Sequence, residues 1–218
     1  MRRLLSLTVG LLALSSSGSL AADIPRPATS PKAPAMISAY DWTGGYIGIS
    51  GGYGWGGSTW SSFGTNAKPS GGIVGLTGGY NWQDTSRFVF GIESDISWSD
   101  MGGQFANASC PTGCETKNSW LGTVRGRAGY AVDRVMPYFT GGLAFGDVEA
   151  TRAGFGSASD TGVGWTVGAG IESVIGGNWT AKVEYLYVDL GSFSCAICSA
   201  ARVDFHSNVV RAGINFRF

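Results

Sequence analysis

The end of the chain alternates strictly between apolar side chains and polar or small ones. The apolar positions are Val210, Ala212, Ile214, Phe216 and Phe218, and the positions between them are Arg211, Gly213, Asn215 and Arg217. Successive side chains of a β-strand point to opposite faces, so this segment is predicted to be a strand with one apolar and one polar face. Val209 is the first residue that departs from the pattern.

The alternation recurs along the chain, with varying strength. It covers residues 42–53, 71–82, 88–98, 120–130, 137–145, 163–172, 179–187 and 210–218. Each segment holds about 9–12 residues, which is the length of a tilted strand that crosses a membrane. The pattern therefore predicts an all-β protein, an eight-stranded antiparallel transmembrane β-barrel.

The connections between these segments differ in length in a regular way. Short connections at residues 84–87, 131–135 and 176–178 alternate with long polar ones at residues 55–70, 99–117, 148–160 and 191–202. Bacterial outer-membrane barrels have short periplasmic turns and long outer loops, whereas a soluble β-sandwich has no reason to separate loop lengths. The even strand number places the start and the end of the barrel on the periplasmic side.

Aromatic side chains lie near both ends of the predicted strands. Those at the short-turn end are Trp42, Trp82, Phe88, Tyr130, Phe139 and Trp179, and those near the long loops are Trp98, Trp120 and Tyr187. Amphipathic rings favour the level of the lipid headgroups, so two aromatic girdles are expected.

The N-terminal part of the chain has a different pattern. Arg2 and Arg3 precede an apolar run at residues 4–14, and Ala21 ends a small-residue cleavage motif, so residues 1–21 are expected to be a secretory signal peptide. Residues 22–40 contain four of the seven prolines, which favours extended backbone and predicts a periplasmic linker. Residues 41–218 are expected to form the barrel, in the outer membrane of a Gram-negative bacterium.

Composition agrees with a membrane barrel. Charged side chains make up only 14% of the chain, against roughly 25% in ordinary soluble domains, while glycine accounts for 36 residues. Removal of residues 1–21 leaves 13 of the 15 basic residues against 15 acidic ones, a net charge of −2. This balance argues against nucleic acid as a partner, because phosphate binding needs a concentrated basic face.

The polar face of the predicted strands carries nine charged side chains. They are Glu93, Asp95, Glu172, Glu184, Arg125, Arg127, Lys182, Arg211 and Arg217. The interior of an eight-stranded barrel is only just wide enough for side chains to fill, and unpaired buried charges cost several kcal/mol. We therefore expect a salt-bridge network that plugs the lumen; the alternative is a small porin that allows limited solute passage.

The chain offers little for catalysis or for a cofactor. His206 is the only histidine, and no spacing constrains a Ser/His/Asp set built with Asp204. We expect a protein that is not an enzyme and holds no cofactor and no metal. Its expected role is structural, in envelope integrity and surface interaction.

Four cysteines fall in two of the predicted long loops. They are Cys110, Cys114, Cys195 and Cys198. Disulfides are expected in the oxidising cell envelope, and the spacing does not choose among the three connectivities. A four-thiolate zinc site has suitable pair spacing, but the compartment argues against it.

Six stretches of the chain resemble a known family. They are AADIP at residues 21–25, YDWTGGYIG at 40–48, GGYNW at 78–82, GIESD at 91–95, GTVRGRAGY at 122–130 and VRAGINF at 210–216. In this order they resemble the small outer-membrane β-barrel proteins of alphaproteobacteria, which are called outer-membrane immunogenic, surface-antigen or porin-family proteins.

The resemblance implies an abundant surface protein, with some relatives described as porins and others as haemin binders. It implies that Tyr187, Phe216 and Phe218 belong to the signal read by the barrel-assembly machinery. For haemin, His206 is the sole imidazole that the chain offers. The expected partners are outer-membrane lipid, the assembly machinery and host or environmental ligands of the outer loops, and the protein is expected to be a monomer.

Overall fold

The computed structural model describes residues 40–60, 65–107, 110–152, 156–195 and 201–218. The strands in these ranges are β1 (Gly44–Trp60), β2 (Thr65–Ala67), β3 (Ser70–Gln83), β4 (Phe88–Asn107), β5 (Cys110–Tyr130), β6 (Val135–Arg152), β7 (Gly156–Gly176), β8 (Trp179–Cys195) and β9 (Ala201–Arg217). Within the same ranges, no helix is long and apolar enough to cross a membrane.

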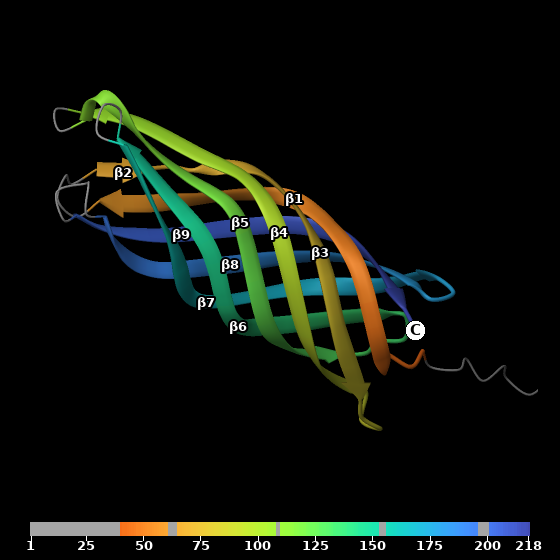
Figure 1. Cartoon of the computed structure of the whole chain (residues 1–218). Helices are drawn as coiled ribbons and strands as arrows, with labels where there is room; N and C mark the ends of the chain where they lie inside the picture. The colour runs from red at the N-terminus through yellow and green to blue at the C-terminus, as the bar shows by residue number, and fades with distance from the viewer. Residues whose placement is uncertain (1–39, 61–64, 108–109, 153–155, 196–200) are drawn as a thin grey trace, which may run out of the picture. The chain divides into compact units, whose positions relative to one another are not determined.

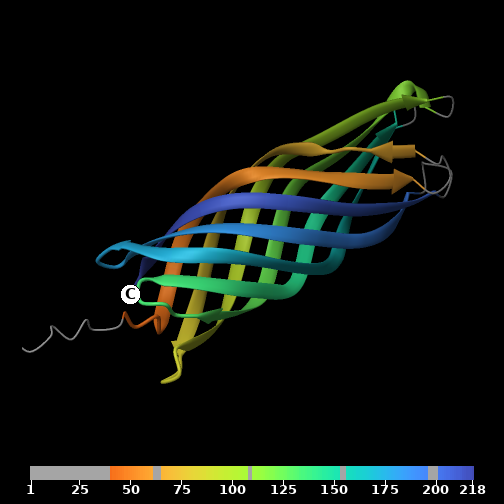
Figure 2. The same cartoon turned by 180° about the vertical axis from the view of Figure 1, so that it is seen from behind.

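The eight long strands form one closed antiparallel barrel (Figure 1). Each pairs with the next long strand in the sequence, and β1 also pairs with β9, from Tyr46 opposite Arg217 to Trp60 opposite Val203. Figure 2 shows the same barrel from behind, with β9 beside β1. Closure pairs the backbone groups of every long strand on both sides, as a lipid environment requires. The predicted eight-stranded transmembrane barrel is confirmed; β2 is a short addition that pairs with residues 58–60 of β1.

Three connections at one end of the barrel are short. Residues 84–87 join β3 to β4, residues 131–134 join β5 to β6, and residues 177–178 join β7 to β8. The chain enters β1 and leaves β9 at this same end, because Gly44 pairs with Asn81 and Tyr46 pairs with Arg217. As predicted, this is the periplasmic end.

The expected long loops are mostly strand, which corrects the sequence prediction. β4 continues to Asn107 and β5 begins at Cys110, so nearly the whole of residues 99–117 belongs to a hairpin of the sheet. The hairpins of β6 with β7 and of β8 with β9 extend in the same manner. Antiparallel pairing satisfies backbone hydrogen bonds whatever the side chains, so a strand can continue where the membrane pattern stops.

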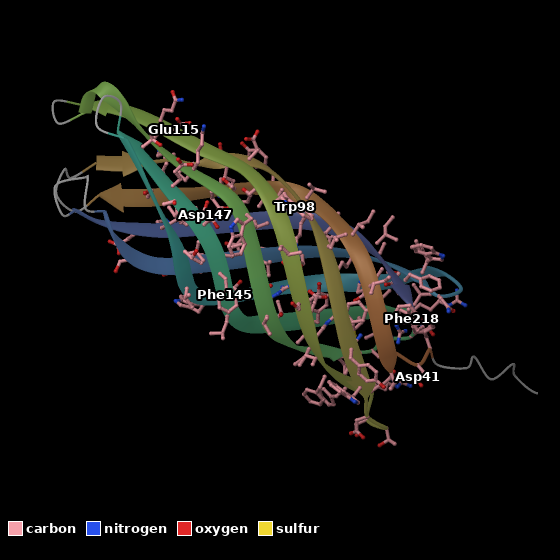
Figure 3. All side chains as sticks on the ribbon, viewed as in Figure 1. Asp41, Trp98, Glu115, Phe145, Asp147 and Phe218 are labelled. Atoms are coloured by element: carbon pink, nitrogen blue, oxygen red, sulfur yellow. The ribbon has the colours of Figure 1, made fainter. Side chains whose placement is uncertain are left out.

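The polarity of the two faces of the sheet is exchanged where the strands leave the membrane. Beyond Trp98 on β4, which Figure 3 labels, Met101 is buried while Asp100 and Gln104 are exposed. Outside the lipid the outer face of the sheet meets water, so polar side chains face outward and apolar ones fill the interior. The irregular Val209 has the same cause, since its side chain is buried inside the barrel.

The outer face of the barrel carries an apolar belt. Exposed apolar side chains on it include Ile47, Ile49, Leu76, Phe90, Ile92, Leu143, Val167, Ile171, Val183 and Ile214. Trp82, Phe88, Tyr130, Phe139 and Trp179 are exposed near the periplasmic end and Trp98 near the outer end, whereas Trp120 and Tyr187 are half-buried. Trp42 is a correction to the predicted girdle, because its side chain is 0% exposed and packs inside the barrel.

Candidate functional site: the barrel interior

The interior of the barrel contains all nine predicted inner-face charges. Each of these side chains is at most 5% exposed. Eight of them are joined by ion pairs: Glu93, Asp95, Glu172, Glu184, Arg125, Arg127, Lys182 and Arg211. We call these eight residues the charge layer. Its four acids and four bases have a formal charge sum of zero.

Asp95 of β4 is held by two arginines of other strands. Arg211 of β9 donates from Nη1 and Nη2 to the two carboxylate oxygens, both at 2.9 Å, and Arg125 of β5 donates at 2.8 Å. Thr123 donates a further hydrogen bond at 2.6 Å. Arg211 Nε also donates to Glu184 of β8 at 2.6 Å, so one guanidinium joins acids of two strands that are not neighbours. Such charge-assisted, two-point bonds are among the strongest available to side chains.

Glu93 lies one inward position from Asp95 on β4 and collects three cations. Lys182 Nζ lies 2.8 Å from its Oε2 and Arg127 Nη1 lies 3.6 Å from the same atom, while Arg125 pairs with the other oxygen. The hydroxyl of Tyr46 donates to Oε2 at 2.8 Å. These donors compensate for the loss of water around a buried carboxylate.

Glu172 extends the charge layer to β7. Its carboxylate accepts hydrogen bonds from Arg127 at 2.7 Å, Thr180 at 2.6 Å and Asn215 at 2.9 Å. These partners come from β5, β8 and β9, so the layer connects strands across the interior.

Two tyrosines that sequence reasoning missed complete the layer. Tyr138 donates to Glu184 at 3.1 Å, and its ring centroid lies 4.0 Å from the guanidinium carbon of Arg127. Tyr46 accepts a hydrogen bond from Arg127 at 3.0 Å. Their inward orientation follows from the alternation, but a selection based on charge alone overlooks phenol groups.

Glycines make room for both phenols. A Cβ at Gly79 would stand 2.5 Å from the Tyr46 hydroxyl oxygen, and one at Gly170 would stand 2.6 Å from that of Tyr138. No Cβ is tolerated at such distances, so the close approach of strand and ring requires glycine. Part of the high glycine content therefore serves the packing of the interior.

On the outer side of the charge layer the interior becomes apolar. Along β8, for example, the inward-facing residues Lys182 and Glu184 are followed by the inward-facing residues Leu186, Val188 and Leu190. We call the buried apolar side chains at this level the outer apolar layer: Ile73, Met101, Leu121, Ala144, Val148, Leu186, Val188, Leu190, Phe205 and Val209. Buried polar side chains lie at the same level, among them Ser97 opposite Leu121, Asn118 opposite Met101 and Ser207 opposite Val188, so the interior outside the charge layer is mostly but not entirely apolar.

A smaller apolar cluster lies on the periplasmic side. It consists of the buried residues Trp42, Val89, Ala131, Met136 and Tyr138, with Tyr40 and Val174 packed against it. Arg217 lies at this level and not in the charge layer. Its guanidinium donates to the backbone carbonyls of Asp41 at 3.0 Å and Thr43 at 3.1 Å.

The other predicted site residues lie on the outside of the barrel or beyond the described part. Phe216 of β9 packs edge-on against Trp179 at 5.1 Å and against Phe218 at 5.8 Å, between ring centroids. The ring of His206 stacks on Tyr187 with a centroid distance of 6.4 Å.

The structure does not describe the cysteine side chains, so the predicted disulfides are not tested. Cys198 lies outside the described residues, and so do the side chains of Cys110, Cys114 and Cys195, although their backbones belong to β5 and β8. The expected disulfides stay a prediction. Among the side chains that are described, no group of three His, Cys, Asp or Glu is placed to hold a metal ion.

An apolar belt around a closed barrel with a charged interior defines an integral outer-membrane protein. The chain belongs to the family of the outer membrane protein beta-barrel domain, whose family model matches residues 9–218. This confirms the family expected from the six stretches of sequence, and with it a location in the outer membrane of a Gram-negative bacterium.

Relatives in alphaproteobacteria match over most of their length. The chain is 39% identical over 238 residues to the 31 kDa outer-membrane immunogenic protein of Brucella melitensis, covering 95% of this chain and 97% of that protein. It is 33% identical over 222 residues to the 25 kDa outer-membrane immunogenic protein of Brucella abortus, covering 100% of both. It is 34% identical to the 22 kDa outer membrane protein of Rhizobium leguminosarum bv. viciae, covering 83% of this chain and 80% of that protein.

Solved structures of other barrels share the fold. The outer membrane protein OprG of Pseudomonas aeruginosa has a TM-score of 0.51 at 14% identity, covering 82% of this chain and 99% of OprG. Neisserial surface protein A has a TM-score of 0.50 at 17% identity, covering 81% of this chain and 98% of that chain. At these identities the likeness concerns the fold alone.

Proposed function

We propose that this protein is a sealed, non-enzymatic barrel that supports the outer membrane and presents its outer hairpins for surface contact. The observation that carries the proposal is the layered interior: a charge layer with zero formal charge, covered on both sides by buried side chains that are mostly apolar. A conducting pore needs a continuous water-filled path, and apolar constrictions exclude water.

The charge layer serves stability and register in this proposal. Each of its acids has at least two partners, and four of the ion pairs join strands that are not neighbours in the sheet: Arg125–Glu184, Arg127–Glu172, Lys182–Glu93 and Arg211–Asp95. A slip of one residue would turn every charge toward lipid, which costs about 2–4 kcal/mol for an arginine or lysine at the membrane centre. The layer thereby favours one register over its alternatives.

The outer hairpins are the proposed surface for contact. Their outward side chains are polar, for example Asp100, Gln104 and Lys117, while their inward side chains continue the core of the barrel. Relatives are called immunogenic, which is in keeping with hairpins exposed at the cell surface. Binding residues of barrel proteins are carried by such outer segments on a rigid scaffold.

Two alternatives are weaker. A small porin would need a path past Leu186, Val188 and Leu190, which are buried in the interior. A haemin site would need an exposed ligand, and His206 is half-buried with its ring stacked on Tyr187.

Further proposals concern partners and assembly. We propose that the apolar belt contacts outer-membrane lipid, that the protein is a monomer, and that Tyr187, Phe216 and Phe218 form part of the signal for barrel assembly. The outward positions of these three aromatic residues support that role.

A deletion strain complemented by two forms of the gene tests the proposed function. One form is the full chain; in the other, residues 103–116 are replaced by Asn-Gly, which joins the cross-strand partners Gly102 and Lys117 by a two-residue turn. Deletion is expected to raise detergent sensitivity without lowering small-solute uptake. The trimmed form is expected to restore detergent resistance but not surface adhesion. A loss of solute uptake on deletion would favour the porin.

A further inference from the structure

We propose that the periplasmic mouth of the barrel is a binding site for an aromatic peptide segment, filled in this protein by its own residues 40–43. These residues precede β1 and contain the stretch Tyr-Asp-Trp-Thr. We call them the mouth segment. The inference rests on the proposed sealed barrel and adds the element that closes the seal on the periplasmic side.

The backbone turns inward at Gly44. Its φ of +138° belongs to the left-handed region that side-chain-bearing residues rarely adopt. A Cβ at this position would also stand 3.2 Å from the carbonyl oxygen of Phe218. Gly44 therefore allows the chain to leave the wall of the barrel and place the mouth segment within the opening.

Trp42 is the anchor of the mouth segment. Its side chain is fully buried against Val89, Ala131, Met136 and Tyr138, which come from β4, β6 and the turn between β5 and β6. Buried aromatic side chains that fill a pocket supply most of the energy of peptide and protein recognition.

Polar contacts fix the backbone of the segment to β3. The backbone N–H of Trp42 donates to the side-chain oxygen of Gln83 at 2.7 Å, and the backbone N–H of Gln83 donates to the hydroxyl of Thr43 at 3.1 Å. The pairing of β3 with β1 ends at Asn81 opposite Gly44, so β1 offers Gln83 no strand partner, and Thr43 satisfies the backbone N–H of Gln83 instead.

Arg217 clamps the segment from β9. It donates to the carbonyl oxygens of Asp41 and Thr43, and its guanidinium carbon lies 5.0 Å from the ring centroid of Tyr40 and 5.4 Å from that of Trp42. A guanidinium at these distances from two rings adds cation–π attraction to the hydrogen bonds. The last strand thus binds the residues that precede the first strand.

The mouth segment reaches the charge layer through Tyr138. This residue packs in the same cluster as Trp42 and donates its hydroxyl hydrogen to Glu184. Withdrawal of the segment would open a route for water from the periplasm to the charged side chains. Conductance would still be blocked by the outer apolar layer, so exposure of the segment and conduction are separate observations.

Fluorescence quenching of the full mature protein tests occupancy of the site. In each background, a second sample with Trp42→Phe isolates the emission of Trp42 by subtraction. In the wild type we expect blue-shifted emission that a water-soluble quencher barely reaches. Arg217→Ala is expected to raise quenching of Trp42 several-fold, whereas Arg134→Ala, an exposed arginine at the same end, should leave it unchanged. Where Arg217→Ala fails to fold, Gln83→Ala removes the hydrogen bond from the Trp42 backbone to β3 and tests the hold on the mouth segment from that side.

A peptide of residues 39–43 tests the binding site itself. Added to a full-length variant in which residues 40–43 are all replaced by glycine, so that its own segment no longer fills the site, the peptide is expected to show a saturable blue shift of its tryptophan emission. Added to the wild type, whose site is filled, it should show none. The same response from both proteins, or none from either, would overturn the proposed site. Unprotected Trp42 emission in the wild type would overturn its occupancy, and neither result depends on whether the barrel conducts.

Discussion

Arg211 and Asp95 form a two-point ion pair across the interior of the barrel, with both nitrogen–oxygen distances at 2.9 Å. The two residues are 116 positions apart in the sequence and lie on β9 and β4, which are not neighbours in the sheet. The pair is almost free of water, since Asp95 is 5% and Arg211 3% exposed. Its contribution to stability therefore depends on both partners being present.

Removal of one partner of this pair is expected to be costly. Arg211→Ala leaves Asp95 with one arginine fewer and Glu184 without its shortest bond, and we expect a loss of about 3–5 kcal/mol in the free energy of unfolding. Denaturant unfolding of the protein in lipid vesicles measures it. Arg134→Ala is the matched control, because Arg134 is exposed in a turn.

The double variant Asp95→Leu/Arg211→Met separates pairing from simple charge removal. It is expected to be more stable than the sum of the two single changes predicts, because neither charge is left alone. Strict additivity in the double-mutant cycle would show that the two side chains do not interact.

Gly79→Ala is expected to destabilise the barrel by about 1–3 kcal/mol, since the new methyl group would overlap the Tyr46 hydroxyl and the carbonyl oxygen of Ile92. Gly72→Ala in the same strand has nothing within 4 Å of the added Cβ and should be neutral. Unfolding midpoints in the same vesicles provide the comparison. Equal effects at the two positions would mean that backbone propensity, and not close packing, explains the glycine.

Ile92→Lys is expected to cost about 2–4 kcal/mol, because the side chain is 57% exposed on the belt that faces lipid. Gln104→Lys lies further along β4, on the water-exposed hairpin, and should have little effect. The yield of folded protein in vesicles and the unfolding midpoint both report this difference. If the two lysines were equally tolerated, the assigned membrane boundary on β4 would be wrong.

Asp41 gives the mouth segment a dependence on acid pH. The backbone N–H and the hydroxyl of Thr43 bind its carboxylate and, with the charge of Arg217, hold its pKa below the ordinary value of 3.8. The ionised form is favoured in the folded state, so the stabilisation is present above that value and is lost as the pH falls below it. The carboxylate is exposed, so the effect should stay below about 1 kcal/mol.

The pH dependence of Trp42 quenching tests this assignment. Wild-type Trp42 is expected to become more accessible only in the acid range, and Asp41→Asn should remove that pH dependence. Asp100→Asn, at the other end of the barrel, is the control. A transition that persists in Asp41→Asn would assign the effect to another group.

The membrane part of the fold could be predicted because lipid and interior impose opposite demands on alternate residues. Glu93 and Ile92 illustrate this, since one is buried in the charge layer and the other faces lipid. The same alternation does not predict the parts of the strands that extend beyond the membrane into the outer hairpins. Around Met101 the outward-facing side chains become polar and the inward-facing ones apolar. A search for membrane strands, which have the opposite pattern, therefore predicts a loop here.

The interior contacts could be predicted only in part. Alternation places Arg125 and Asp95 on the inner face, but sequence does not show which strands meet across the lumen. The alternation predicts Trp42 in the aromatic girdle, because the inward turn at Gly44 depends on backbone geometry that the alternation does not encode. The side chain of Arg217 faces inward like those of the charge layer. Because Arg217 lies at the periplasmic end, its partners are backbone carbonyls and not carboxylates.

Single-channel recording in planar lipid bilayers tests the central claim, the sealed lumen, most directly. The folded protein, with Glu93, Lys182 and the other charges of the layer paired and covered by the outer apolar layer, is expected to insert without stable conductance steps. Sustained ohmic steps of uniform size from the pure, folded protein would contradict the sealed barrel and establish a water-filled path through it.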